Sequence, residues 1–206
     1  ITSPPPYRPE MQESFFEKCP QNGNSPYLLF LSRLHEKKGV DLLINAYKHL
    51  SLSLPDGQRL PNLVIAGPGL ESAYGRYLVK LASDLPYSIF FSGMLSGDAK
   101  WGAFYGCEAF VLPTHQENFG IAIVEALACK KPVLISSKTN IWREIDSSGA
   151  GIVEEDTLSG TVNLLSRWCN LSEDEKAIYG VRAINAYKSH FSVHSMEQKW
   201  LSLIQQ

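Results

Sequence analysis

Two cations lie close together in a segment that has the composition of an anion-binding loop. Arg33 follows a short apolar run, and Lys38 precedes Gly39 and a helical pattern that begins at Val40. Free backbone N–H groups at the amino end of a helix attract anions, while Arg offers a planar fork and Lys a mobile charge. These features predict a site for a diphosphate. A solvated charged turn is the alternative interpretation, and it is the one that we favour for Lys37.

Two glutamates follow a later apolar run. Glu125 is the single charged residue between Phe119 and Cys129, in a stretch that reads as a buried helix. Burying a carboxylate costs several kcal/mol unless hydrogen-bond donors satisfy it. The hydroxyls of a ribose can donate to it, or a basic side chain or backbone amides from a neighbouring element can. Glu117 precedes the same helix, where it either interacts with the helix dipole or contacts the hydroxyls of a sugar attached to the diphosphate.

Residues around the first glutamate are further candidates for ligand binding. Thr114 and His115 end the preceding apolar run and can reach the same pocket, although a lone histidine is more often structural. Asn118 can cap the following helix, because its side chain accepts hydrogen bonds from free N–H groups there. Phe119 and Gly120 complete the segment, which we treat as one candidate binding loop.

Two other turns also follow apolar runs. The turn at 66–70 contains Gly67 but does not match a dinucleotide-binding fingerprint, since Ser72 stands where the third glycine would be. It is either a turn that lets the backbone approach a ligand or an ordinary turn. Met94 and Leu95 follow the next run, where they can flank a nucleobase or pack into the core. The later segment 140–145 can add polar groups to the same rim.

The elements that must position these residues alternate along the chain. The apolar runs cover residues 27–31, 62–66, 88–91, 109–112, 132–135 and 150–153. The helical patterns between them cover residues 40–50, 71–82, 98–105 and 120–129, and helices alone are expected from 156 to 206, with breaks near 170 and 191. This alternation predicts an α/β fold, a Rossmann-like doubly wound parallel sheet with extra C-terminal helices. Ligands of such sheets lie at the carboxyl ends of the strands, where the candidate residues stand.

Composition excludes several other classes of protein. The 206 residues include 21 acidic and 19 basic side chains, giving a net charge of −2, which argues against a nucleic-acid binder. A hydrophobic fraction of 44% is that of a globular protein. No apolar run approaches the roughly 18 residues that span a bilayer, and no signal peptide is visible, so we expect a cytoplasmic protein. Four widely spaced cysteines indicate neither a disulfide framework nor a zinc site.

The length supports one large domain. We expect residues 1–25 to be a linker or lead-in segment, because prolines dominate its start, and residues 26–206 to form the domain. Since the first residue is Ile and not an initiator Met, we expect a piece of a longer protein.

Taken together, the loops resemble the carboxyl-terminal, donor-binding half of retaining glycosyltransferases that have two Rossmann-like domains, the GT-B fold of family 4 or group 1. Arg33 and Lys38 resemble the diphosphate-binding Arg and Lys of that family. Glu117 and Glu125 resemble its Glu-x7-Glu motif. The resemblance implies that the first glutamate contacts the donor sugar and the second the ribose.

The sequence departs from the family pattern at three places. Ser32 stands where glycine usually precedes the arginine, and Asn118 stands where glycine usually follows the first glutamate. The family commonly has a paired-glycine turn after the fifth strand, and here residues 140–143 precede Glu144 instead. No charged group is lost, but the shape of the donor pocket is expected to differ.

The resemblance implies a nucleotide-sugar-binding domain whose donor is a UDP-, GDP- or ADP-sugar. The hexose of this donor would be transferred, with retention, to a sugar or lipid acceptor. An absent amino-terminal domain would hold the acceptor. The expected catalytic residues are Glu117, Arg33 and Lys38. The expected substrate-binding residues are Glu125, Asn118, Phe119, Gly120, Thr114, His115, Gly67, Met94 and Leu95. We expect no metal, no other cofactor and no nucleic acid, and we expect this part alone to bind donor without transferring it. Peripheral membrane association of the full-length protein fits the same class.

Two other functions are compatible with these residues. A non-hydrolysing sugar-nucleotide epimerase would use the same fold and ligand. A non-catalytic nucleotide-binding regulatory module would share the fold, and would tolerate changes at Glu117.

Overall fold

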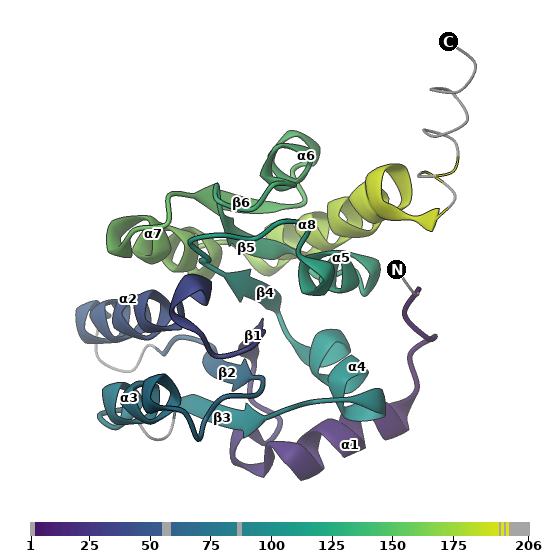
Figure 1. Cartoon of the computed structure of the whole chain (residues 1–206). Helices are drawn as coiled ribbons and strands as arrows, with labels where there is room; N and C mark the ends of the chain where they lie inside the picture. Colours follow the sequence, from purple (N-terminus) through teal and green to yellow (C-terminus); the bar gives the residue numbers. More distant parts are fainter. Residues whose placement is uncertain (1–2, 55–58, 86–87, 194, 196, 198–206) are drawn as a thin grey trace.

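One six-stranded parallel sheet forms the centre of the protein (Figure 1). The computed structural model describes residues 3–54, 59–85, 88–193, 195 and 197. Its strands are β1 (Tyr27–Leu31), β2 (Asn62–Ala66), β3 (Ile89–Gly93), β4 (Ala109–Leu112), β5 (Val133–Ser136) and β6 (Gly151–Glu154). They lie in the order β3-β2-β1-β4-β5-β6, and all neighbours are parallel. The predicted Rossmann-like, doubly wound fold is confirmed.

The strand order reverses between β1 and β4. The chain first builds outward from β1 to β3, then crosses back and adds β4 beside β1. Every residue of β4 and β5 is buried, as expected for strands covered on both faces. The loops that leave β1 and β4 lead to helices on opposite faces of the sheet, and ligands of such folds bind at this switch point. Because β1 and β4 pair directly, the two candidate loops begin side by side.

Helices cover both faces of the sheet. Figure 1 shows α2 (Val40–Ser53), α3 (Ala73–Ala82) and α7 (Leu158–Cys169) on one side. On the other side are α1 (Pro9–Lys18), α4 (Gly97–Gly106), α5 (Ile121–Ala128) and α8 (Glu173–Ala186). The chain passes from β5 to β6 through α6 (Trp142–Ser148), and short helical turns occur at η1 (Pro20–Asn22), η2 (Glu36–Lys38) and η3 (Tyr187–Phe191).

The predicted C-terminal helices are present as far as the structure describes them. Helix α7 ends at Cys169, with Asn170 as its C-cap, and η3 ends before Ser192, close to the two predicted breaks. Residues 198–206, which the same prediction covers, lie outside the described residues. Among the helices that are described, none is long and apolar enough to cross a membrane.

The prediction that residues 1–25 form a linker was wrong for Pro9–Lys18. These residues form helix α1, with Pro9 at its first position, where a missing N–H costs nothing. Met11 and Phe15 lie one turn apart and are fully buried. The helix packs closely on α4. A Cβ added at Gly102 of α4 would lie only 1.9 Å from the carbonyl oxygen of Met11. Residues 1–2 lie outside the described part.

A second helix was also missed. The segment after β5 was expected only to supply polar groups, but its residues Trp142–Ser148 form α6. Gly149 ends this helix in the left-handed conformation, at φ 60°. With seven residues, α6 is too short for its periodicity to stand out in the sequence.

The four cysteines are free. Burial raises the pKa of the Cys107 and Cys129 thiols to about 12, and that of Cys169 to about 11. These three side chains are therefore neutral thiols at physiological pH and act as small apolar residues.

Candidate active site

The loop after β1 is pressed against the loop after β4. Gly39 joins η2 to α2 in the left-handed conformation, at φ 66°, and a Cβ there would lie 2.1 Å from the carbonyl oxygen of Pro113. The N-cap of α2 is Gly39, which has no side chain to cap the first turn, and Asp41 is the acidic residue of that turn. Arg33 is exposed at the end of β1, and Lys38 is half-buried directly before α2.

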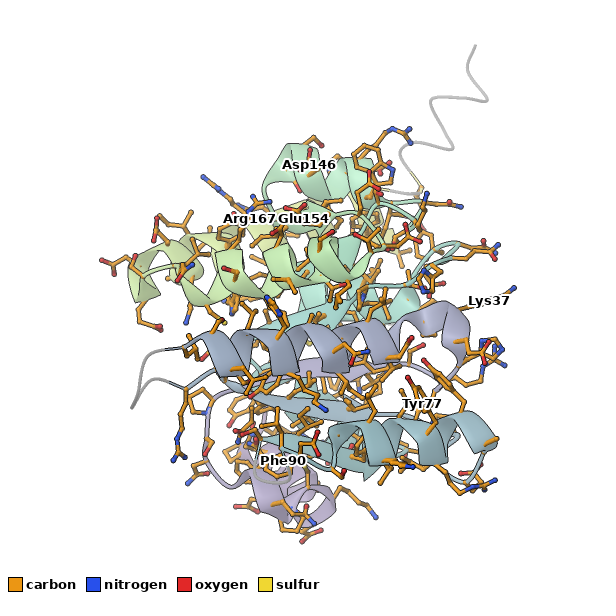
Figure 2. The ribbon with its side chains drawn as sticks, turned by 90° about the vertical axis from the view of Figure 1, so that its left-hand side faces the viewer. Lys37, Tyr77, Phe90, Asp146, Glu154 and Arg167 are labelled. Atoms are coloured by element: carbon orange, nitrogen blue, oxygen red, sulfur yellow. The ribbon has the colours of Figure 1, made fainter. Side chains whose placement is uncertain are left out.

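Backbone contacts hold the β4 loop against η2. The Thr114 hydroxyl is buried and donates to the carbonyl oxygen of Lys37 at 2.7 Å. The backbone N–H of His115 donates to the same oxygen at 2.8 Å. The side chain of Lys37 points away from the molecule (Figure 2), while its neighbour Lys38 turns inward. Thr114 therefore fixes the relative position of two loops and does not present its hydroxyl to solvent.

The two candidate motifs meet in one ion pair. Nζ of Lys38 lies 2.5 Å from Oε2 of Glu117, and the two side chains keep only 17% and 20% of their exposure. The residues are far apart in sequence, so the sheet brings them together. This contact places the predicted diphosphate-binding lysine beside the predicted sugar-binding glutamate.

The backbone of Glu117 is held by the loop after β5. Its N–H donates to the carbonyl oxygen of Lys138 at 3.1 Å, and its own carbonyl oxygen accepts from the N–H of Asn140 at 3.0 Å. Glu117 and Thr139 form an isolated parallel bridge. With its main chain fixed on one side and Lys38 on the other, the Glu117 carboxylate is positioned before any ligand arrives.

A lysine that the sequence analysis missed pairs with the second glutamate. Nζ of Lys100 lies 2.6 Å from Oε1 of Glu125, a residue that is only 7% exposed. The same ammonium lies 4.5 Å from the centroid of the Trp101 ring. A basic side chain from a neighbouring element, one of the three kinds of partner predicted for this carboxylate, is thus present. Lys100 is the one cation in the sequence of α4, a signal that could have singled it out.

The other predicted residues fall into different environments. Asn118 is exposed and does not cap α5, because Gly120 occupies the N-cap with φ 70° and the helix has no side-chain cap. Phe119 is half-buried and meets the Phe191 ring edge-on, with centroids 6.4 Å apart. Leu95 is buried in the core, the alternative considered for it, whereas Met94 is 68% exposed. The expected capping role of Asn118 was therefore wrong.

Gly67 allows the turn after β2 to lie directly against the backbone that follows β1. Its φ is 144°, and a Cβ there would lie 1.9 Å from the carbonyl oxygen of Ser32. Its N–H donates to the carbonyl oxygen of Gly93 at 2.8 Å. The close approach therefore joins the turn after β2 to the residue directly before Arg33.

His115 links the β4 loop to the segment after β6. Its Nδ1 lies 2.9 Å from Oδ2 of Asp156, and Lys138 lies 3.9 Å from the other carboxylate oxygen. Partial burial would raise the pKa of Asp156, but the hydrogen bond from His115, a backbone hydrogen bond and the charge of Lys138 together lower it. The histidine is thus paired within the protein, in line with the structural role considered for it.

Replacing Asp156 with Asn should reduce the free energy of unfolding by about 0.5–1 kcal/mol at neutral pH, as expected for an exposed pair. A carboxylate whose pKa is lower in the folded state stabilises above its unfolded value, about pH 4, and loses this effect as the pH falls through the folded value. Urea titrations of the wild type and Asp156→Asn should therefore differ at neutral pH and converge in acid. A difference that is constant down to about pH 2 would contradict this account.

Comparison with known proteins decides the family. The sequence model described as "Glycosyl transferases group 1" matches residues 11–178, which is most of the chain and includes both motifs. The chain belongs to the group 1 glycosyltransferase family. The resemblance drawn from Arg33, Lys38, Glu117 and Glu125 is confirmed at the level of the family.

Individual proteins also match this chain, at low sequence identity. The O-antigen chain mannosyltransferase C of Escherichia coli is 24% identical over 182 residues, covering 86% of this chain and 46% of the relative. A crystal structure of a glycosyltransferase from Rickettsia africae ESF-5 superposes with a TM-score of 0.78 at 20% identity, covering 96% of this chain and 52% of the other. The structure of Anabaena Alr3699/HepE in complex with UDP and glucose gives 0.76 at 19%, covering 97% and 53%. The chain spans about half the length of these proteins, and the structures share its fold.

Proposed function

We propose that this chain is the donor-binding half of a retaining glycosyltransferase that transfers a hexose from a nucleotide-diphosphate sugar to a sugar or lipid acceptor. The contact between Lys38 and Glu117 is the observation that carries the proposal, because it unites an anion-binding cation and a hydroxyl-binding carboxylate at the switch point of the sheet. A diphosphate joined to a sugar presents both matching groups. The solved HepE complexes, with UDP and with UDP-glucose, support a ligand of this class.

In this mechanism the cations act on the leaving group. Negative charge grows on the diphosphate as the glycosidic bond breaks, and Arg33 and Lys38 stabilise it in the transition state. Lys38 then exchanges its contact with Glu117 for one with phosphate, and Glu117 turns to the hydroxyls of the sugar. Because two cations supply the positive charge that a divalent ion supplies in metal-dependent enzymes, we propose that no metal cofactor is needed. Glu125 binds the ribose.

The acceptor is proposed to bind in an amino-terminal domain that this chain does not include. The described part would then bind donor without transferring it. A cytoplasmic enzyme, with peripheral membrane association of the full-length protein when the acceptor is a lipid, belongs to the same proposal.

Thermal unfolding with added nucleotides tests the proposal. We expect one of UDP, GDP, ADP and CDP, or its sugar conjugate, to stabilise the chain by about 2.7 kcal/mol at roughly 100 times its dissociation constant. Lys38→Met should lose most of this shift. Lys37→Met is the matched control, because the neighbouring side chain points outward and should leave the shift unchanged. A folded wild-type chain that responds to none of these nucleotides would overturn the proposal.

The two alternative functions give other results. An epimerase would convert a sugar nucleotide into its isomer without any acceptor. A regulatory module would bind nucleotide yet tolerate Glu117→Ala in the full-length protein. Incubation of full-length protein with donor, with and without candidate acceptors, separates these three functions.

A further inference from the structure

The pair formed by Lys100 and Glu125 is the strongest feature that the proposed mechanism leaves unexplained. The Glu125 side chain retains 9% of its exposure and the Lys100 side chain 23%. Two helices that are separate in sequence, α4 and α5, contribute one charge each. Of the described ion pairs with both side chains no more than one quarter exposed, this one contains the most buried carboxylate.

We propose that Lys100 is a positioning residue for nucleotide binding: it compensates the buried charge of Glu125 and holds one carboxylate oxygen, so that the other oxygen receives the ribose hydroxyls. This inference rests on the proposed function, since it assumes that a ribonucleotide binds at Glu125. It adds a residue of α4 to a site otherwise built from the β1 and β4 loops and α5.

The compensation of a buried charge is the first argument. A carboxyl group that is buried among apolar residues takes up a proton unless a cation or donors offset the desolvation. A ribose diol offers two O–H donors, and an ionised carboxylate can accept both, whereas a protonated one must use one oxygen as a donor. Lys100 is the cation that lies beside the Glu125 carboxylate.

The two carboxylate oxygens supply the second argument. Oε1 accepts from Lys100 at 2.6 Å, while Oε2 accepts no hydrogen bond from any residue within the described ranges. The ammonium is itself fixed, since the face of Trp101 lies beside it. One oxygen is therefore held by protein and the other is left for a ligand.

Other ionisable groups around α5 do not take the place of Lys100. Strands β4 and β5 carry no charged residue. Cys129, at the end of α5, is kept as a neutral thiol by burial. Helix α8 carries charged side chains and η3 carries Lys188 and His190, and none of those described forms an ion pair with Glu125.

The test measures dissociation constants of UDP, GDP and ADP and of their 2′-deoxy forms by calorimetry on this chain. Lys100→Met and Lys100→Gln should weaken ribonucleotide binding about tenfold and weaken binding of the deoxy forms much less, so the preference for ribose should fall. Lys100→Arg keeps the charge and should retain the ribose preference. The deoxy forms correct for any general damage to the site.

Lys48→Met is the matched control. Lys48 is 24% exposed and pairs with Asp84 at 2.6 Å on the opposite face of the sheet, so its loss should leave the ribose preference unchanged. If folded Lys100→Gln keeps the wild-type preference, Lys100 has no positioning role. If the wild type binds none of the ribonucleotides, the proposed function itself fails, which is a different result.

Discussion

Gly67→Ala is expected to lower the free energy of unfolding by about 3–5 kcal/mol, the largest single loss that we predict. Two costs add together. The φ of 144° is a conformation that is nearly exclusive to glycine, and the new methyl group would lie 1.9 Å from the carbonyl oxygen of Ser32. The turn after β2 would have to move away from the end of β1. Chemical denaturation of the two proteins measures the difference.

The same substitution should weaken nucleotide binding, because Ser32 directly precedes Arg33. Gly23→Ala is the control: Gly23 also has positive φ, at 52°, but nothing lies within 4 Å of its added Cβ. This variant should lose only about 1 kcal/mol, from backbone conformation alone. Equal losses of unfolding free energy at the two positions would mean that the loops separate easily. The close approach at Gly67 would then contribute nothing to the cost of the substitution.

Glu125→Ala should lower the free energy of unfolding by about 2–3 kcal/mol. Removing one partner of a buried ion pair leaves the other charge without compensation, at a typical cost of about 3–5 kcal/mol, and the partial exposure of Lys100 reduces it. In the proposed function the variant should also lose its preference for ribose over deoxyribose nucleotides. Urea titration measures the first effect and nucleotide calorimetry the second.

Two further variants separate the ion pair from general damage. Glu154→Ala removes a carboxylate whose partner Arg167 is 55% exposed, on the face that Figure 2 presents, and it should cost under about 1 kcal/mol. The double variant Lys100→Met with Glu125→Leu replaces the buried charges by apolar side chains and should come within about 1 kcal/mol of the wild type. If the double variant is as unstable as Glu125→Ala, lost packing and not unpaired charge is the cause.

The sequence predicts the sheet well, because strands covered on both faces must be continuously apolar. All six strands lie within two residues of the predicted runs. Helix α1 was missed because the prolines before it dominate the composition of the lead-in, while its buried Met11 and Phe15 form only a two-residue pattern. Short α6 was missed for a related reason, since seven residues show too little periodicity.

The candidate site was predictable in part. Charged residues at strand ends indicated Lys38 and Glu117, and the parallel sheet predicted that their loops are neighbours. The need of Glu125 for a donor was also visible, but the identity of Lys100 depends on which residue of α4 faces α5. The N-cap of α5 was misassigned because Asn118 has a capping side chain, whereas the left-handed Gly120 sets the start of the helix.

The ion pair between Lys38 and Glu117 also bears on selectivity. Each group already has a counterion 2.5 Å away, so a ligand must replace a contact that the free protein possesses. Inorganic phosphate could compensate Lys38, but it would leave the carboxylate of Glu117 without a counterion and beside a second anion. A molecule with phosphate at one end and hydroxyls at the other compensates both. In the proposed function, this exchange of partners would disfavour the abundant simple anions of a cell without any steric barrier.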